Sequence, residues 1–215
     1  MCGRSKDCRD LPGLLTGLGE LGLCPSESMI AAAISAYGRS GQCQESLQLL
    51  ETMHERIGLK PGPGCFTAAI GCCSSHEGHC ERALALLGEM RRQRMPVTEI
   101  TYVAAISACG KSQQCERALE LLEEMHTAGN LPRSARTYNA VIAACCKSKQ
   151  FAKGRQVLEL MEADGVPPNT ESYTTLISAA RKAGLWHDAA KLGRNSGKSG
   201  LVLFFLLTTW FFYFC

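Results

Sequence analysis

A cluster of cysteine and histidine side chains in CCSSHEGHC, residues 72–80, has the composition of a metal site. Thiolates and imidazoles at short spacing are the ligands that zinc prefers. Cys73 and Cys80, however, each fall in a column of the internal repeat described below, and a one-residue insertion explains the unusual loop. We therefore expect these cysteines to pack in a core as small apolar residues, and we predict no metal site.

Three further segments resemble nucleotide-binding motifs by their letters. GLGELG from Gly17 matches GxGxxG, but the sequence predicts neither a strand before it nor a β-α-β unit after it. CGKS at Cys109 and SGKS at Ser196 lack the upstream glycine of a phosphate-binding loop. No nucleophile–base arrangement is visible either. We predict no catalytic residues, no cofactor and no enzymatic activity.

Basic residues recur at one place in the internal repeat, where the first helix of a unit is expected to end. They are Arg39, Lys111, Lys147 and Lys182, here called the basic column. Equivalent positions of stacked repeats lie along one face, so the column suits the phosphates of a nucleic acid. A cation at a helix C-terminus is also favourable by roughly 0.3–1 kcal/mol whatever it binds, and both explanations remain open.

The internal repeat shows in segments that recur about every 36 residues. TYVAAISACGKSQQ begins at Thr101 and TYNAVIAACCKSKQ at Thr137, with nine of fourteen positions identical. Each such segment keeps an isoleucine at the same place: Ile34, Ile70, Ile106, Ile142 and Ile177. Amphipathic blocks such as ERALELLEEM follow, and they end on Met53, Met90, Met125 and Met161.

Each unit predicts two short helices. The first is small and apolar, and the second has Leu and Met at three- and four-residue spacing with charged residues between them. Gly and Pro in segments such as GVPPN end one helix and begin the next. One helix pair cannot bury its apolar face, whereas stacked pairs share a continuous core. We predict an all-α fold, an α-solenoid of stacked helix-turn-helix repeats of about 35 residues.

The repeat divides the chain into segments. They are an N-terminal segment with a degenerate half repeat at 1–25, complete units at 26–62, 63–98, 99–134 and 135–169, a truncated fifth unit at 170–193, and a linker with a hydrophobic tail at 194–215. Because both ends are irregular and terminal repeats must cap the core, we expect that part of a longer protein is missing.

The thirteen cysteines are odd in number and contain no CxxC motif, so a reducing compartment is expected. Six of them fall in two repeat columns, which are predicted to be core columns because large apolar residues such as Phe and Trp replace Cys there. One column holds Cys73, Cys109, Cys145, Tyr37 and Ala180, and the other holds Cys43, Cys80, Cys115, Phe151 and Trp186. The net charge of +3 permits contact with nucleic acid without indicating it.

The units resemble pentatricopeptide repeats. The matching features are TYNAVIAAC at the start, ALELLEEM in the second helix and GVPPN at the end, over about residues 26–192. Tetratricopeptide repeats have a similar period but require Gly where these units have Ile. The resemblance implies a chloroplast or mitochondrial protein that binds single-stranded RNA at one base per repeat. The HxE and CxxC motifs of the deaminase domain that some family members carry are absent.

In the family, base choice depends mainly on the residue after the aromatic that opens a unit and on the last residue of the unit. The resemblance therefore implies base-reading candidates at Ala31, Thr67, Val103, Asn139, Thr174 and Asn169. Asn139 with Asn169 resembles a pyrimidine-reading pair, since amides can bond a Watson–Crick edge. The alternative is that Asn139 caps its helix.

The tail LVLFFLLTTWFFYFC, residues 201–215, carries no charge. As a helix it would span roughly 22 Å, short of the roughly 30 Å hydrocarbon core. A short membrane anchor and a truncated or misjoined chain end are both open interpretations.

Two functions are compatible with these patterns. The first is a single-stranded RNA-binding helical-repeat protein in organellar RNA processing, stability or translation. The alternative is a protein–protein interaction scaffold, whose inner face would hold a peptide as other helical repeats do.

Overall fold

The computed structural model describes residues 25–57, 59–75, 78–127 and 131–195, and within these ranges every regular element is an α-helix. The helices are α2 (Glu27–Ser40), α3 (Cys43–Ile57), α4 (Pro63–Cys73), α5 (Cys80–Arg92), α6 (Glu99–Lys111), α7 (Cys115–Thr127), α8 (Ala135–Lys147), α9 (Phe151–Ala163), α10 (Thr170–Lys182) and α11 (Trp186–Asn195). The predicted all-α class is confirmed.

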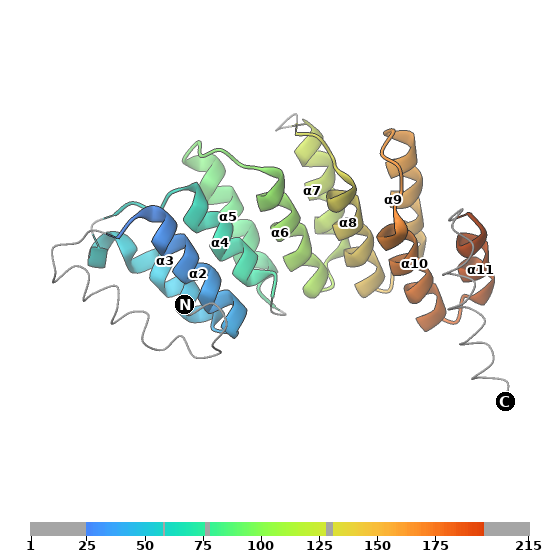
Figure 1. Ribbon diagram of the computed structural model, residues 1–215, viewed down its shortest axis with the longest axis horizontal. Coiled ribbons are helices and arrows are strands. Elements are labelled where there is room, and N and C mark those ends of the chain that lie inside the picture. Colours follow the sequence, from blue (N-terminus) through green and yellow to red (C-terminus); the bar gives the residue numbers. More distant parts are fainter. Residues whose placement is uncertain (1–24, 58, 76–77, 128–130, 196–215) are drawn as a thin grey trace.

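The helices form successive hairpins that stack in chain order (Figure 1). We call α2, α4, α6, α8 and α10 the first helices and α3, α5, α7, α9 and α11 the second helices. Each first helix packs on the second helix that follows it, and neighbouring first helices pack on one another. Each hairpin thus buries its apolar face against the next one, which is the packing of an α-solenoid.

The repeated isoleucines and methionines form the centre of this stack. Ile34, Ile70, Ile106 and Ile142 are fully buried in the first helices, and the methionines that close the second-helix blocks are buried with them. The fifth isoleucine differs: Ile177 is half-buried, whereas its neighbour Leu176 is fully buried. No described first helix packs on the far side of α10, so this position lacks the cover that the other four have.

Small residues let the first helices approach closely. A methyl group on Gly110 of α6 would lie 2.9 Å from the Cα of Ala144 in α8, and one on Gly38 of α2 would lie 3.1 Å from the Cα of Cys72 in α4. The second helices have no comparable contacts with one another in the described part of the chain. Closer spacing in one layer bends a stack toward that layer, so the first helices lie on its inner side.

The cysteine columns are core columns, with one exception. Their cysteines are buried throughout, and Phe151 is buried at the same place. Trp186, predicted for the same core column, is instead 54% exposed. Cys80 and Cys115 are covered by the first helix of the following hairpin, whereas no described helix follows α11 to cover Trp186.

Candidate nucleic-acid interface

The basic column lies at the C-terminal ends of the first helices. Arg39, Lys111, Lys147 and Lys182 occupy the last turns of α2, α6, α8 and α10, and α4 has no cation there. Within the described residues none of the four forms an ion pair with a carboxylate. Burial lowers the pKa of Lys147, and the positive charge of Lys111 lowers it further. The two ammonium groups therefore lie near enough to repel each other, and a bound anion would relieve that repulsion.

A hollow of about 720 Å³ between α8 and α10 brings two kinds of candidate together. Lys147 and Lys182 of the basic column line it, and so does Thr174, a base-reading candidate. The side chain of Thr174 is exposed, and its hydroxyl donates to the carbonyl of Thr170 in its own helix at 2.8 Å. The hollow thus presents cations and a hydroxyl on one surface.

A second hollow, of about 480 Å³, lies between α2 and α4. Ala31, Thr67 and Arg39 line it together with small apolar residues, and Ile100 lies at its edge with 58% of its surface exposed. The hydroxyl of Thr67 is within 3.0 Å of that of Thr101. The structure therefore brings Ala31 and Thr67 to one surface beside one cation.

Of the other base-reading candidates, Val103 and Asn139 are buried, whereas Asn169 is exposed. Val103 is 8% exposed and Asn139 is 6% exposed. Val103 offers no polar group, so it could act only by packing. Its position matches that of Thr67 and Thr174, but its side chain belongs to the core.

The amides of Asn139 and Asn169 lie together but bond each other rather than being free to bond a base. Asn139 Nδ2 donates to Asn169 Oδ1 at 3.2 Å and to Glu171 Oε2 at 2.9 Å. Asn139 Oδ1 accepts a hydrogen bond from Ser172 Oγ at 2.6 Å. Both ends of the Asn139 amide are therefore engaged within the protein.

Helix capping explains Asn169 and not Asn139. Asn169 is the N-cap of α10 and forms a capping box with Ser172. The N-cap of α8 is Ser134, whose side chain accepts from Arg136 N, so the alternative that Asn139 caps its helix is wrong. Sequence reasoning missed Glu171 and Ser172 as partners of Asn139, because they belong to the next hairpin and no pattern within one unit signals the contact.

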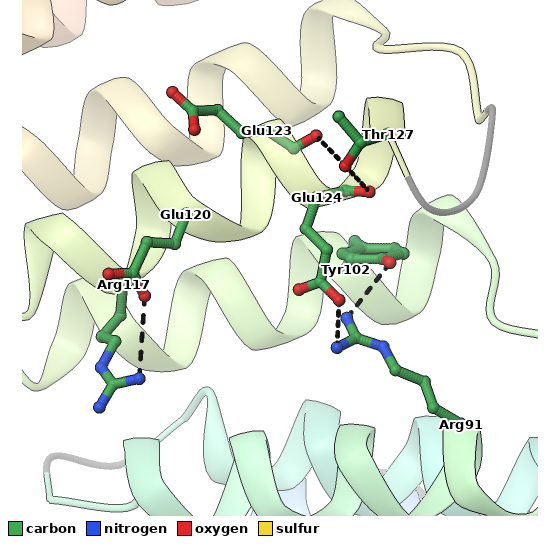
Figure 2. Close-up of polar contacts among 7 residues, drawn as sticks. All are labelled: Arg91, Tyr102, Arg117, Glu120, Glu123, Glu124 and Thr127. Atoms are coloured by element: carbon green, nitrogen blue, oxygen red, sulfur yellow. Dashed lines mark hydrogen bonds and ion pairs between the residues drawn. The ribbon is translucent and has the colours of Figure 1, made fainter.

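Several, though not all, cations elsewhere in the described part of the chain are paired with carboxylates (Figure 2). Arg91 of α5 forms an ion pair with Glu124 of α7, donates to the Tyr102 hydroxyl of α6 at 3.2 Å and lies 5.6 Å from the centre of the Tyr102 ring. Arg133 makes the same kind of contact with Asp164, at 2.9 Å. These pairs join neighbouring hairpins and neutralise the cations there, in contrast to the basic column.

Two predictions about other sites fall partly outside the described residues. No group of three or more His, Cys, Asp or Glu side chains that could hold a metal ion occurs in the part that the structure describes, and His76 of the 72–80 cluster lies outside it. None of the described helices is long and apolar enough to cross a membrane. The tail 201–215 lies outside the described residues, as do residues 1–24 with the degenerate half repeat.

The fold and the surface define a helical-repeat protein with a basic inner edge. A family model described as the pentacotripeptide-repeat region of PRORP matches residues 23–191. The match covers most of the chain, which therefore belongs to the pentatricopeptide-repeat family.

Curated relatives carry the same family name. A chloroplastic pentatricopeptide repeat-containing protein of Arabidopsis thaliana is 30% identical over 143 residues, which cover 65% of this chain and 27% of the relative. Pentatricopeptide repeat-containing protein 10, chloroplastic, of Zea mays is 31% identical over 106 residues, which cover 49% of this chain and 13% of that protein. The chain thus spans 27% or less of the length of either relative.

Solved structures share the fold. PPR10 in complex with an 18-nt psaJ RNA element superposes with a TM-score of 0.73 at 19% identity, over 89% of this chain and 28% of that one. The PPR domain of Arabidopsis thaliana protein-only RNase P 1 in complex with tRNA gives a TM-score of 0.62 at 16% identity, over 79% of this chain and 88% of that domain. The predicted α-solenoid is confirmed.

Proposed function

We propose that the chain binds single-stranded RNA along the inner face of its first helices. The observation that carries the proposal is the basic column, whose cations form no ion pair with a carboxylate among the described residues. Two of them, Lys147 and Lys182, lie beside Thr174 in the hollow between α8 and α10. Ammonium groups at regular intervals bind a phosphate backbone, and polar side chains beside them can contact the bases. In this arrangement Arg39, Lys111, Lys147 and Lys182 bind phosphates, and Ala31, Thr67, Val103, Asn139, Thr174 and Asn169 are the base-reading positions.

The comparisons support this function and an organellar location. Two solved structures with this fold are complexes with RNA, and several relatives are named as chloroplastic or mitochondrial proteins. We propose that the chain acts in organellar RNA processing, stability or translation. The mechanism is steric, because a strand held along the stack is shielded from other proteins or presented to them.

The candidate side chains suit binding rather than catalysis. They are ammonium and guanidinium groups, amides, hydroxyls and small apolar groups, and none forms a nucleophile–base pair within the described residues. Four or five hairpins at one base per repeat read only about as many bases. We therefore expect weak and unselective binding by this chain alone.

A charge-reversal experiment tests the proposal. Changing Lys111, Lys147 and Lys182 together to Glu should abolish binding to a short single-stranded RNA, measured by fluorescence anisotropy, and should leave the circular dichroism spectrum unchanged. The matched control makes the same change in net charge on the second helices, by replacing the exposed residues Arg92, Arg117 and Arg155 with Glu. Equal loss of binding in both triple variants would show that net charge alone, and not the position of the lysines, controls RNA binding. Unchanged affinity of the lysine variant would refute the proposed surface.

The hollow between α2 and α4 favours a second function. Half of its lining is alanine and glycine, Ile100 is exposed at its edge, and Arg39 is the one cation among the described residues that line it. Such a surface suits an apolar peptide side chain better than a phosphate, so this end of the stack could serve as a protein-interaction scaffold. Binding that persists at high salt and in the lysine variant would identify this function.

A further inference from the structure

Two pairs of buried cysteines join neighbouring hairpins in the same way. Cys80 begins α5, and its sulfur lies 3.0 Å from that of Cys109 in α6. Cys115 begins α7, and its sulfur lies 2.8 Å from that of Cys145 in α8. In both pairs the first residue of a second helix meets the end of the next first helix. The following joint has Phe151 and Ala180 in these places.

We propose that Cys80 and Cys109 form an oxidative modification site, at which a disulfide ties the second hairpin to the third. The pair Cys115–Cys145 repeats the site at the next joint. The sulfurs are already in contact, so a bond of about 2.05 Å requires only a small movement. Core packing alone explains one buried thiol at each position, but it does not require two thiols to face each other at successive joints.

The Cys80–Cys109 pair has a route to solvent. Cys80 lines an open hollow of about 320 Å³, together with Lys111 and Gln114. Its thiol donates to Gln114 Oε1 at 3.1 Å, so one side of the sulfur faces a polar, solvated region. A small oxidant can therefore reach Cys80 before it reaches Cys109.

Burial slows the oxidation of Cys80 and Cys109 but does not prevent it. Removal from water raises the pKa of the Cys80 and Cys109 thiols, because it disfavours the thiolate. The thiolate is the form that reacts with a disulfide. Oxidation should therefore accelerate as pH rises, and it should require sustained exposure to the oxidant.

The oxidant class is a low-molecular-weight disulfide, R–S–S–R. The Cys80 thiolate attacks one of its sulfurs, which breaks the S–S bond, forms a mixed disulfide and releases one R–S⁻. The Cys109 thiolate then attacks the Cys80 sulfur and expels the second R–S⁻. The two cysteines lose two electrons in total, one new S–S bond replaces the one broken, and the two thiol protons end on two molecules of R–SH.

The test incubates the full chain with oxidised glutathione at pH 8 and then alkylates the remaining thiols with N-ethylmaleimide. Cleavage after Lys, Arg and Glu isolates Cys80 in residues 78–81 and Cys109 in residues 100–111, so mass spectrometry can identify a cross-link between them. We expect that cross-linked peptide, and a rise of roughly 5–10 °C in the melting midpoint that dithiothreitol reverses.

Variants separate the site from the other thiols. Cys109→Ser should abolish the cross-link between Cys80 and Cys109 and make the rise in melting midpoint smaller, while the Cys115–Cys145 pair can still be oxidised. Cys65→Ser, which changes a buried thiol whose sulfur lies 3.8 Å from the carbonyl oxygen of Glu27, should leave both unchanged. Recovery of Cys80 and Cys109 as alkylated thiols, or of Cys80 only as a glutathione adduct, would overturn the proposal. If a variant fails to fold, the presence or absence of the cross-link in the wild-type protein still tests the proposal. The experiment contains no RNA, so its result is independent of the proposed RNA binding.

Discussion

Asn139 carries a structural role in addition to its candidate role in reading a base. Its amide is 6% exposed and bonds Asn169, Glu171 and Ser172, all from the start of the next hairpin. A base that bonded Asn139 would have to displace one of these partners. Thr174 occupies the equivalent position one unit later, but it is exposed and bonds only its own helix.

This difference gives a prediction for two matched alanine variants. Asn139→Ala should lower the free energy of unfolding by about 1–3 kcal/mol, because it leaves buried partners without their hydrogen bonds. Thr174→Ala should change it by no more than about 0.5 kcal/mol, because the site is exposed. Urea unfolding followed by circular dichroism measures both values. Equal stability of the two variants would show that the Asn139 network contributes nothing to folding.

The residue scale also shows how far sequence reasoning reaches. The 36-residue spacing correctly predicts that Ile34, Ile70, Ile106 and Ile142 share one core, because burial follows from the helical period and the stacking of units. It cannot predict that Asn139 is closed off by Glu171, because that contact depends on side-chain rotamers of two different hairpins.

At the scale of the helices, the first-helix layer is tightly packed and the second-helix layer is open. Gly110 lies inside α6 against the backbone of Ala144, whereas a methyl group on Gly88 inside α5 would meet nothing within 4 Å. Both glycines have helical neighbours on either side. The same substitution therefore tests the spacing of each layer separately.

Gly110→Ala and Gly88→Ala should shift stability in opposite directions. Gly88→Ala should stabilise the protein by up to about 1 kcal/mol, because alanine has the higher helix propensity and the site is empty. Gly110→Ala should destabilise it by roughly 1–3 kcal/mol, because α6 and α8 must move apart. Chemical denaturation measures both, and stabilisation by both variants would mean that the first helices are not held at contact distance.

Helix existence and type could be predicted from the sequence, whereas the ends of the stack could not. The amphipathic blocks predict the second helices because their period is that of an α-helix. Trp186 follows the same pattern and is nevertheless exposed. Burial at a repeat position requires a neighbouring hairpin, which the pattern within one unit does not specify.

At the scale of the molecule, stacking brings single weak cations from four of the described hairpins into a column along one face. A single exposed lysine binds a phosphate only weakly, but several at a regular spacing bind successive phosphates of one strand and release their counterions. The ion pairs of Arg91 and Arg133 neutralise two other cations, which are therefore less able to bind phosphates. Among the described residues, the inner face therefore carries cations that form no ion pair, although the net charge of the whole chain is only +3.

The salt dependence of binding to a short single-stranded RNA tests this account most directly. If the four cations of the basic column each neutralise one phosphate, the slope of log K against log salt should be about −2.8, and Lys147→Gln should make it less steep by about 0.7. Arg155→Gln on a second helix should leave it unchanged. A slope near zero for the wild-type chain, or equal slopes for the wild type and Lys147→Gln, would contradict the account.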